Sequence, residues 1–134
     1  MGKLGKWTRM KDKMYITFTI PGPPVPKARA RVGRCGAFTP QRTKEYEAKV
    51  RALALVARQK ARQRMWSGPV CLGVRFFVNR PEETPDIDNL IKSITDACSG
   101  VIYKDDAQIT HLWASKNLSS EPCAIVTFSK DDGG

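Results

Sequence analysis

Acidic residues and one lysine are clustered in a short part of this chain. Asp86 and Asp88 stand two positions apart, Lys92 follows four positions later, and Asp105 and Asp106 come from the next segment. Neighbouring carboxylates raise each other's pKa and repel, so such a cluster is costly without a counter-ion. A divalent cation removes that cost, and Mg²⁺ prefers carboxylate oxygens. The pattern therefore predicts a magnesium site.

Phosphodiester hydrolysis is the chemistry that fits this set of residues. Two cations about 3.5–4 Å apart can activate a water and stabilise the leaving oxygen. Lys92 could then act as a fixed positive charge against the negative charge that develops at phosphorus. A simpler alternative makes Asp86 or Asp88 a helix cap and pairs Lys92 with Asp96. That alternative leaves the two later aspartates without a role.

Other phosphate or metal motifs fit poorly. Asp86-x-Asp88 begins like a calcium-binding EF-hand loop, but Ile91 stands where that loop needs glycine and Ala97 where it needs glutamate. The chain has neither a Walker phosphate loop nor a dinucleotide glycine fingerprint.

Charge is unevenly distributed along the 134 residues, which carry a formal net charge of +10. Residues 1–81 hold 19 basic and three acidic side chains, whereas residues 82–134 hold four basic and ten acidic ones. A basic half favours a polyanionic partner, and an acidic segment favours bound cations. Together they are typical of an enzyme that cuts nucleic acid, although solvated helix surfaces would account for the charges alone.

The pattern of apolar residues predicts one compact α/β domain of α+β character, with a mixed sheet packed against one long and one short helix. Residues 14–130 are expected to form this domain, after a flexible basic extension at 1–13 and before a frayed end at 131–134. A Pro- and Gly-containing basic loop follows the first strand and ends near Gly36. We expect strands at 15–20, 70–78, 107–116 and 123–129, and helices from 40 to about 65 and from 88 to 98.

Both helices have a predicted apolar face. Gly100 is the expected stop of the short helix, and most bases of the long helix are expected to be solvated. The core residues predicted for the long helix are Tyr46, Val50, Leu53, Ala54 and Ala57. Those predicted for the short helix are Ile87, Leu90, Ile91, Ile94, Ala97 and Cys98.

The cysteines and the histidine give no recognisable metal-binding motif. Cys71, Cys98 and Cys123 lie in apolar patterns and are expected to pack as small hydrophobic residues. No pair has C-x-x-C spacing, and His111 has no His or Cys neighbour in the sequence. The spacing therefore argues against a structural zinc site.

No apolar run has the length of a membrane span or the form of a signal peptide, so a cytoplasmic protein without a membrane partner is expected.

Four linked motifs make the chain resemble the RusA family of Holliday junction resolvases over roughly residues 14–128. The family pattern D-x-D-N-L-x-K matches residues 86–92, its D-A matches residues 96–97, and its D-D-x-Q-[IV] matches residues 105–109. Its opening P-x-x-K-x-R-x-R matches Pro24 to Arg31. The resemblance implies a small homodimer that binds four-way DNA junctions and makes paired nicks with Mg²⁺, or with Mn²⁺ in its place.

The resemblance also assigns roles to residues. It implies metal binding by Asp86, Asp88 and the acidic pair, with Asp106 favoured over Asp105. The catalytic residues it implies are Asp86, Asp88, Lys92 and Asp106. Asn89 and Asp96 are expected in supporting positions, where Asp96 could pair with Lys92. The DNA-binding residues expected in the basic loop are Lys27, Arg29, Arg31 and Arg34.

Two other functions stay open. A non-catalytic DNA-binding protein would need the basic residues but not the acidic cluster with Lys92. A metal-dependent nuclease acting on flaps, forks or RNA would need both, and motifs do not distinguish it from a junction resolvase. Many proteins of the family are encoded by phages or prophages, so a bacterial or phage origin is expected.

Overall fold

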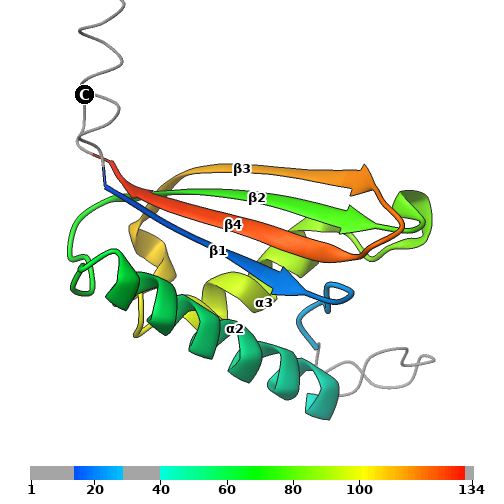
Figure 1. The fold of residues 1–134 in the computed structure, drawn as a ribbon, viewed down its shortest axis with the longest axis horizontal. Coiled ribbons are helices and arrows are strands. Elements are labelled where there is room, and N and C mark those ends of the chain that lie inside the picture. Colours follow the sequence, from blue (N-terminus) through cyan, green and yellow to red (C-terminus); the bar gives the residue numbers. More distant parts are fainter. Residues whose placement is uncertain (1–13, 29–39, 132–134) are drawn as a thin grey trace, which may run out of the picture.

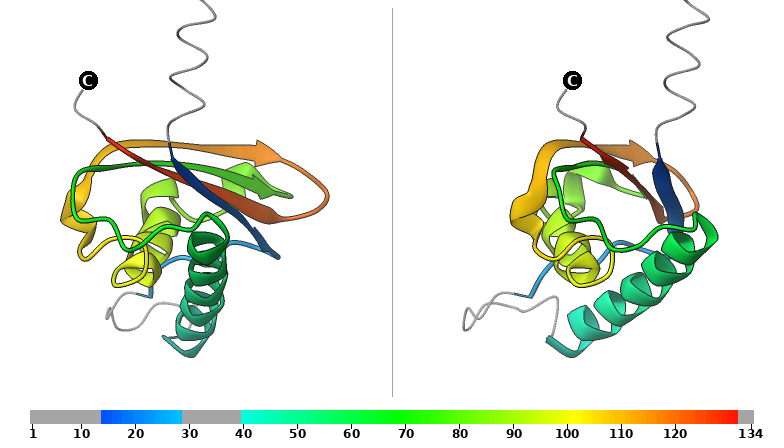
Figure 2. Two further views of the ribbon diagram at one scale, coloured as in Figure 1. Left: turned by 60° about the vertical axis from the view of Figure 1, so that its left-hand side comes forward. Right: turned by 90° about the vertical axis from the view of Figure 1, so that its left-hand side faces the viewer.

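The computed structural model describes residues 14–28 and 40–131. In these ranges one four-stranded sheet is covered on one face by two helices, α2 (Pro40–Lys60) and α3 (Ile87–Cys98), as Figures 1 and 2 show. The strands are β1 (Tyr15–Pro21), β2 (Val70–Val78), β3 (Ile109–Leu118) and β4 (Cys123–Lys130). Two short 3₁₀ helices, η1 (Pro81–Glu83) and η2 (Asp106–Gln108), flank α3 along the chain. This is the predicted mixed-sheet α+β fold.

The strands lie in the order β1-β4-β2-β3. β2 and β3 are parallel, and the other neighbours are antiparallel. Parallel neighbours need a crossover connection, and the segment η1-α3-η2 provides it. The strands β3 and β4 are consecutive in the chain but are separated by β2 in the sheet. The crossover therefore places the acidic residues before α3 and those of η2 around one helix.

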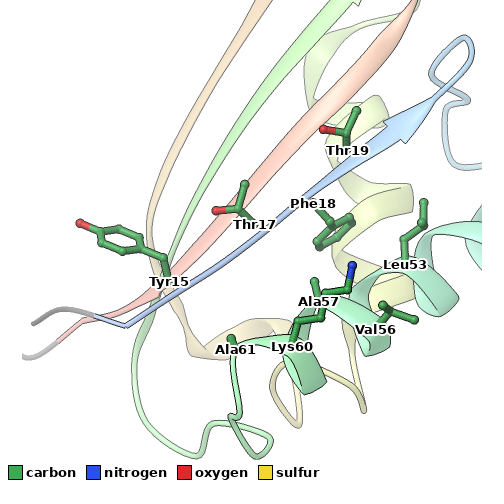
Figure 3. Close-up of a pocket in the computed structure, with 9 residues that line it drawn as sticks. All are labelled: Tyr15, Thr17, Phe18, Thr19, Leu53, Val56, Ala57, Lys60 and Ala61. Atoms are coloured by element: carbon green, nitrogen blue, oxygen red, sulfur yellow. The ribbon is translucent and has the colours of Figure 1, made fainter. Parts of the chain in front are cut away.

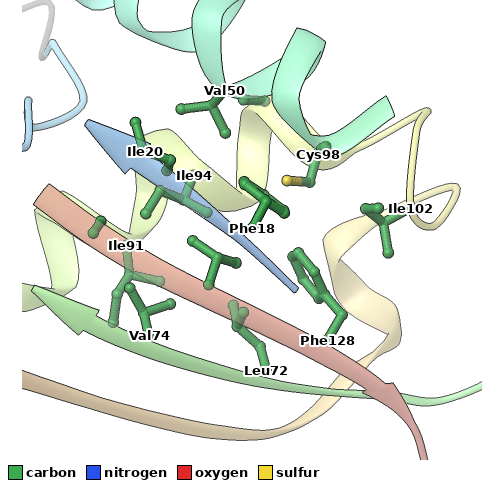
Figure 4. Close-up of a cluster of buried hydrophobic side chains, with 14 of the residues drawn as sticks. Phe18, Ile20, Val50, Leu72, Val74, Ile91, Ile94, Cys98, Ile102 and Phe128 are labelled. Atoms are coloured by element: carbon green, nitrogen blue, oxygen red, sulfur yellow. The ribbon is translucent and has the colours of Figure 1, made fainter. Parts of the chain in front are cut away.

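The core lies between the sheet and the helices (Figure 4). Alternate residues of β1 and β2 are buried, as the period of two in a half-covered sheet requires. The predicted core faces of both helices are confirmed, with Leu53 and Ile87 packed at the margin. Figure 3 shows a hollow between β1 and α2, lined by Phe18, Leu53, Val56 and others. None of the aspartates of the predicted metal site lines it.

The helix α2 ends at Lys60, about five residues earlier than predicted. The N–H of Gln63 donates to the carbonyl of Arg58 and the N–H of Arg62 to that of Gln59, which is the Schellman arrangement. Arg62 has φ of 56°, a left-handed conformation that usually requires glycine. Because an arginine stands where a helix end usually has glycine, the sequence gives no sign that the helix ends before Ser67-Gly68-Pro69.

The start of β3 differs from the prediction, and two arginines of α2 make contacts that were not predicted. The strand predicted from residue 107 starts at Ile109 because η2 occupies the preceding residues. Arg51 and Arg58 are not only solvated: they donate to the carbonyls of Ser99 (3.3 Å) and Val101 (2.9 Å).

Cys98 is fully buried as predicted, and burial raises the pKa of its thiol to about 12. Cys71 and Cys123 are only half-buried. Both lie on strands whose outer face no helix covers in the described residues, so they pack less completely than Cys98.

The stop of α3 agrees with the prediction. Ser99 is the C-cap, and Gly100 follows with φ of 87°, a conformation in which a Cβ would be strained. None of the helices in the described ranges is long and apolar enough to cross a membrane.

Candidate active site

The polar stripe of α3 carries the centre of the candidate site. Asp88, Lys92 and Asp96 are spaced by four residues, so they lie on one side of the helix, away from its buried face. The Nζ of Lys92 lies 2.9 Å from Oδ1 of Asp96 and 3.2 Å from Oδ2 of Asp106. Lys92 therefore joins α3 to η2, and the predicted pair with Asp96 is present.

The two aspartates at the start of α3 keep their carboxylates available. Asp86 is the N-cap residue by position, but its side chain makes no capping hydrogen bond. Asp88 accepts a hydrogen bond from the backbone N–H of Asn89 at 2.9 Å through Oδ1. Both side chains are exposed. Helix capping, the simpler explanation for Asp86, is therefore not what its carboxylate does.

Asp105 and Asp106, the later acidic pair, make different contacts. Oδ1 of Asp105 accepts a hydrogen bond from the N–H of Ala107 at 3.0 Å, so this side chain caps η2. That hydrogen bond stabilises the charged form and lowers the pKa of Asp105. Asp106 instead faces Lys92. Of the two, Asp106 is the one directed toward the residues of α3.

Gln108 holds this turn in place, a role that the sequence analysis did not assign. Its Oε1 accepts hydrogen bonds from the backbone N–H groups of Lys104 (2.9 Å) and Asp105 (3.1 Å). Its Nε2 donates to the carbonyls of Trp66 (2.9 Å) and Gly68 (3.0 Å). An acidic residue followed three positions later by glutamine is the spacing of a capping box. The sequence therefore did carry a signal for this role of Gln108.

Lys27 lies in an ion-pair network. Its Nζ is 2.8 Å from Oε2 of Glu47 and 3.1 Å from Oδ2 of Asp96. Asp96 thus binds Lys27 through one oxygen and Lys92 through the other. The partner Glu47, on α2, was not predicted, because nothing in its helical position distinguishes it from a solvated acid. A DNA contact by Lys27 stays a prediction.

The segment after β1 is fastened across α3. The N–H of Lys27 donates to the carbonyl of Asn89 (3.1 Å), and the buried hydroxyl of Ser93 donates to the carbonyl of Val25 (2.7 Å). Thr43 donates to Pro26 from the side of α2 (3.1 Å). Residues 23–28 are therefore clamped between both helices. The other predicted DNA-binding residues, Arg29, Arg31 and Arg34, lie outside the described residues.

The loop that leads into Asp86 is held from β3. Nζ of Lys116 donates to the carbonyl of Thr84 (3.0 Å) and to that of Pro81 (3.4 Å). A lysine in the strand thereby fixes the connection through η1. Lys116 is the third positioning residue that sequence patterns did not reveal.

The ion pairs among Lys27, Lys92 and Asp96 favour the charged forms of all three side chains. Hydrogen bonds to Asp96 and Asp106 raise the pKa of Lys92 despite its partial burial. The pKa of Lys27 is raised chiefly by Glu47. Burial alone would raise the pKa of Asp96, but its two lysine partners outweigh burial and lower it. Lys92 is therefore a permanent cation at neutral pH and could not serve as a general base.

The donor set of the site suits a hard cation. Asp86, Asp88, Asp105 and Asp106 offer only carboxylate oxygens, which Mg²⁺ and Mn²⁺ bind. No three of these four side chains have ligand atoms within 4.8 Å of one another. Oxygens around one Mg²⁺ lie at most about 4 Å apart at bond lengths of about 2.1 Å. Shared binding would therefore draw the two segments together and compete with Lys92 for Asp106.

Two comparisons with known proteins give matches that cover most of this chain. Residues 21–128 match the model of the family described as Endodeoxyribonuclease RusA. The chain is also 32% identical over 131 residues to "Uncharacterized protein YqaN" of Bacillus subtilis (strain 168), which covers 80% of this chain and 90% of the relative. The family match spans every described residue of the candidate site from Lys27 to Gln108.

Proposed function

This chain belongs to the RusA family of endodeoxyribonucleases, and we propose that it resolves four-way DNA junctions by metal-dependent hydrolysis of paired phosphodiester bonds. The observation that carries this proposal is the contact of Lys92 with both Asp96 and Asp106. That contact joins the side chain of Lys92, in the middle of α3, to the turn at η2. A protein that only bound DNA would not need carboxylates there, since they repel phosphate.

In the proposed reaction, Asp86, Asp88 and Asp106 hold Mg²⁺ or Mn²⁺, and Asp105 keeps η2 in shape. When bound, such cations supply an activated water and neutralise charge at the scissile phosphate. Lys92 places a fixed positive charge beside the phosphate oxygens. Asp96 keeps Lys92 aligned, and Asn89 contributes its backbone carbonyl to the clamp on the segment before the basic loop.

The basic loop is proposed to bind the DNA backbone. Residues 29, 31 and 34 are arginines, and they follow directly on the clamped segment 23–28. Lys27, at the base of the loop, contacts Asp96, which contacts Lys92. This continuity supports a loop whose DNA contacts are anchored to the same helix as the catalytic lysine.

Paired cutting further requires two active sites related by a two-fold axis, because a four-way junction has two-fold character. We propose a homodimer with C2 symmetry, which supplies both sites from one chain. Light scattering coupled to size exclusion would give its mass with and without junction DNA.

The test is cleavage of a synthetic four-way junction with an immobile core, labelled on each strand in turn. Mg²⁺, Mn²⁺ and EDTA are compared, and linear duplex, flap and fork substrates of the same sequence are cut in parallel as controls. Metal-dependent, symmetric nicks in the junction alone are expected. Tight junction binding without cleavage under either metal would instead support a DNA-binding protein, and equal cleavage of flaps or forks would assign a broader substrate.

A further inference from the structure

A cluster of three different ligand types lies on the sheet, apart from the acidic site on α3. Cys71 comes from β2, His111 from β3, and Asp131 directly follows β4. One thiol sulfur, one imidazole nitrogen and one carboxylate oxygen all lie within 4.8 Å of one another. No other group of three such side chains occurs within residues 14–28 and 40–131.

The backbone of the sheet fixes these three positions. Cys71 pairs with His111 in the parallel ladder and with Ser129 in the antiparallel one. The N–H of Asp131 donates to the carbonyl of Pro69 at 2.9 Å, which continues the pairing of β4 with β2. Two of the three ligands are therefore in paired strands, and the third is joined to the sheet by a backbone hydrogen bond.

A shift in register brings the histidine to the cysteine. Val70 pairs with Ile109, but Cys71 pairs with His111, so Thr110 is an extra residue on β3. Such a bulge re-aims the side chains that follow it. Without the shift, His111 would pair with the buried Leu72 and point to the face covered by the helices. The irregularity thus places imidazole and thiol on the same face.

The distances suit a tetrahedral ion. Nδ1 of His111 lies 3.3 Å from Oδ2 of Asp131. Zinc bonds of about 2.0–2.3 Å give a tetrahedron whose ligand atoms are about 3.3–3.7 Å apart. Nδ1 and Oδ2 already have this spacing, and the sulfur lies within 4.8 Å of one nitrogen of His111 and one oxygen of Asp131, so it would have to approach those two atoms by about 1.5 Å or less. A change of side-chain rotamer covers that distance.

A neighbouring hydroxyl orients the carboxylate. Oγ1 of Thr110 donates to Oδ2 of Asp131 at 2.6 Å, and it lies 3.1 Å from Nδ1 of His111. Metal ligands are commonly held in this way by a hydrogen bond from a second residue. The side chain of Asp131 is 19% exposed and that of His111 is 71% exposed. Cys71 and His111 also line an open hollow with Trp113, so an ion can reach the cluster from solvent.

We propose that Cys71, His111 and Asp131 form a second metal site, which binds Zn²⁺ or a similar transition metal and leaves one position for water or another ligand. Thiolate and imidazole select such ions, whereas Mg²⁺ is bound through oxygen. The site would tie together β2, β3 and the end of β4. Because β3 starts directly after η2, it would also brace the turn that carries Asp105 and Asp106. The sequence spacing hid this site, since its ligands come from two strands and from the residue that follows a third.

The test is a titration of metal-free protein with Co²⁺, which replaces Zn²⁺ and gives a thiolate-to-cobalt absorption band. Wild-type protein is expected to show this band with saturation at one ion per chain, and added Zn²⁺ should abolish it. Cys71→Ser and His111→Ala should lose the band. Cys123→Ser is the matched control, because Cys123 is another half-buried cysteine and pairs with Phe77 at the far end of β2.

Two further variants make the result decisive. Thr110→Val should weaken Zn²⁺ binding about 10–100-fold, as expected for a residue that orients a ligand. Asp88→Asn should leave the cobalt band unchanged, which separates this site from the candidate active site. A wild-type protein without the band, or a band that survives in Cys71→Ser, would overturn the proposal and leave His111 and Asp131 as an ion pair only. No DNA is present, so loss of nuclease activity cannot imitate either outcome.

Discussion

Nζ of Lys27 lies 3.1 Å from Oδ2 of Asp96, which joins the base of the basic loop to the helix that carries Lys92. The clamp on residues 23–28 holds the backbone of Lys27, and Glu47 holds its side chain from α2. This arrangement separates the positioning of Lys92 from DNA binding, and the two can be measured apart.

The first prediction concerns the basic loop. Arg29→Ala combined with Arg31→Ala should weaken junction binding and reduce its dependence on salt, by about one unit of slope for each lost phosphate contact. Lys27→Met should lower the cleavage rate because Asp96 loses one of its two lysine partners, and a DNA contact by Lys27 would show as a further fall of the salt slope by about one unit. Binding measured by fluorescence anisotropy across a range of salt concentrations gives both slopes. Equal slopes for wild type and the double variant would remove these arginines from the DNA interface.

The second prediction concerns the metal ligands. Asp88→Asn should abolish cleavage while junction binding is retained, because the change removes a ligand and also reduces repulsion with phosphate. Glu83→Gln is the control, since this exposed acid lies in η1 and pairs with Arg80. Single-turnover cleavage and binding are measured on the same labelled junction. Normal cleavage by Asp88→Asn would disprove the metal assignment.

Lys92 allows a third test. Lys92→Met should reduce the rate of cleavage by about 10²–10³, the usual effect of removing one group that stabilises transition-state charge. Lys104→Met is the matched control, an exposed lysine next to Asp105. Because the pKa of Lys92 is raised above its ordinary value of 10.5, cleavage by wild type should show no loss from its deprotonation up to pH 10. A loss below pH 9 that disappears in Lys92→Arg would contradict a permanently charged lysine.

Much of this arrangement followed from local sequence patterns, and the rest depends on contacts between distant segments. The apolar face of α3 has a period of 3.6, so Leu90 and Ile94 were predictable as core residues. The insertion of β2 between β3 and β4 was not, because alternation in a strand does not say which strand is its neighbour. The roles of Glu47 and Lys116 could not be predicted either, since they are defined only by partners far away in the chain.

The fourth prediction concerns pH. Asp96→Asn should destabilise the fold at neutral pH by about 1 kcal/mol or less, because the ion pairs of Asp96 are partly exposed. The pKa of Asp96 is lowered in the folded protein, so its stabilisation is complete above the ordinary pKa of aspartate. It is lost as pH falls through the folded pKa. Urea unfolding at pH 7 and at several acidic values should show the two proteins converging in acid.

The control for this prediction is Asp131→Asn, which removes a carboxylate from the opposite side of the sheet. The pH dependence of its free energy of unfolding need not follow that of Asp96→Asn. The cleavage rate of Asp96→Asn should also fall, with junction affinity nearly unchanged, because Lys92 loses one of its two carboxylate partners. A rate equal to that of wild type would show that Asp106 alone positions Lys92.

The last prediction tests the stop of α2. Arg62 has a left-handed backbone conformation that costs a non-glycine residue about 1–2 kcal/mol. Arg62→Gly removes that strain but makes the unfolded chain more flexible, which offsets about 0.4–1 kcal/mol. A net stabilisation of about 0.5–1 kcal/mol is expected in urea unfolding, while Arg64→Gly, at a neighbouring exposed arginine, should not stabilise. The stop is joined to η2 by the hydrogen bond from Trp66 to Gln63 at 3.0 Å and by that from Gln108 to Trp66. Because neither bond involves the side chain of Arg62, the variant should leave η2 and junction cleavage unchanged.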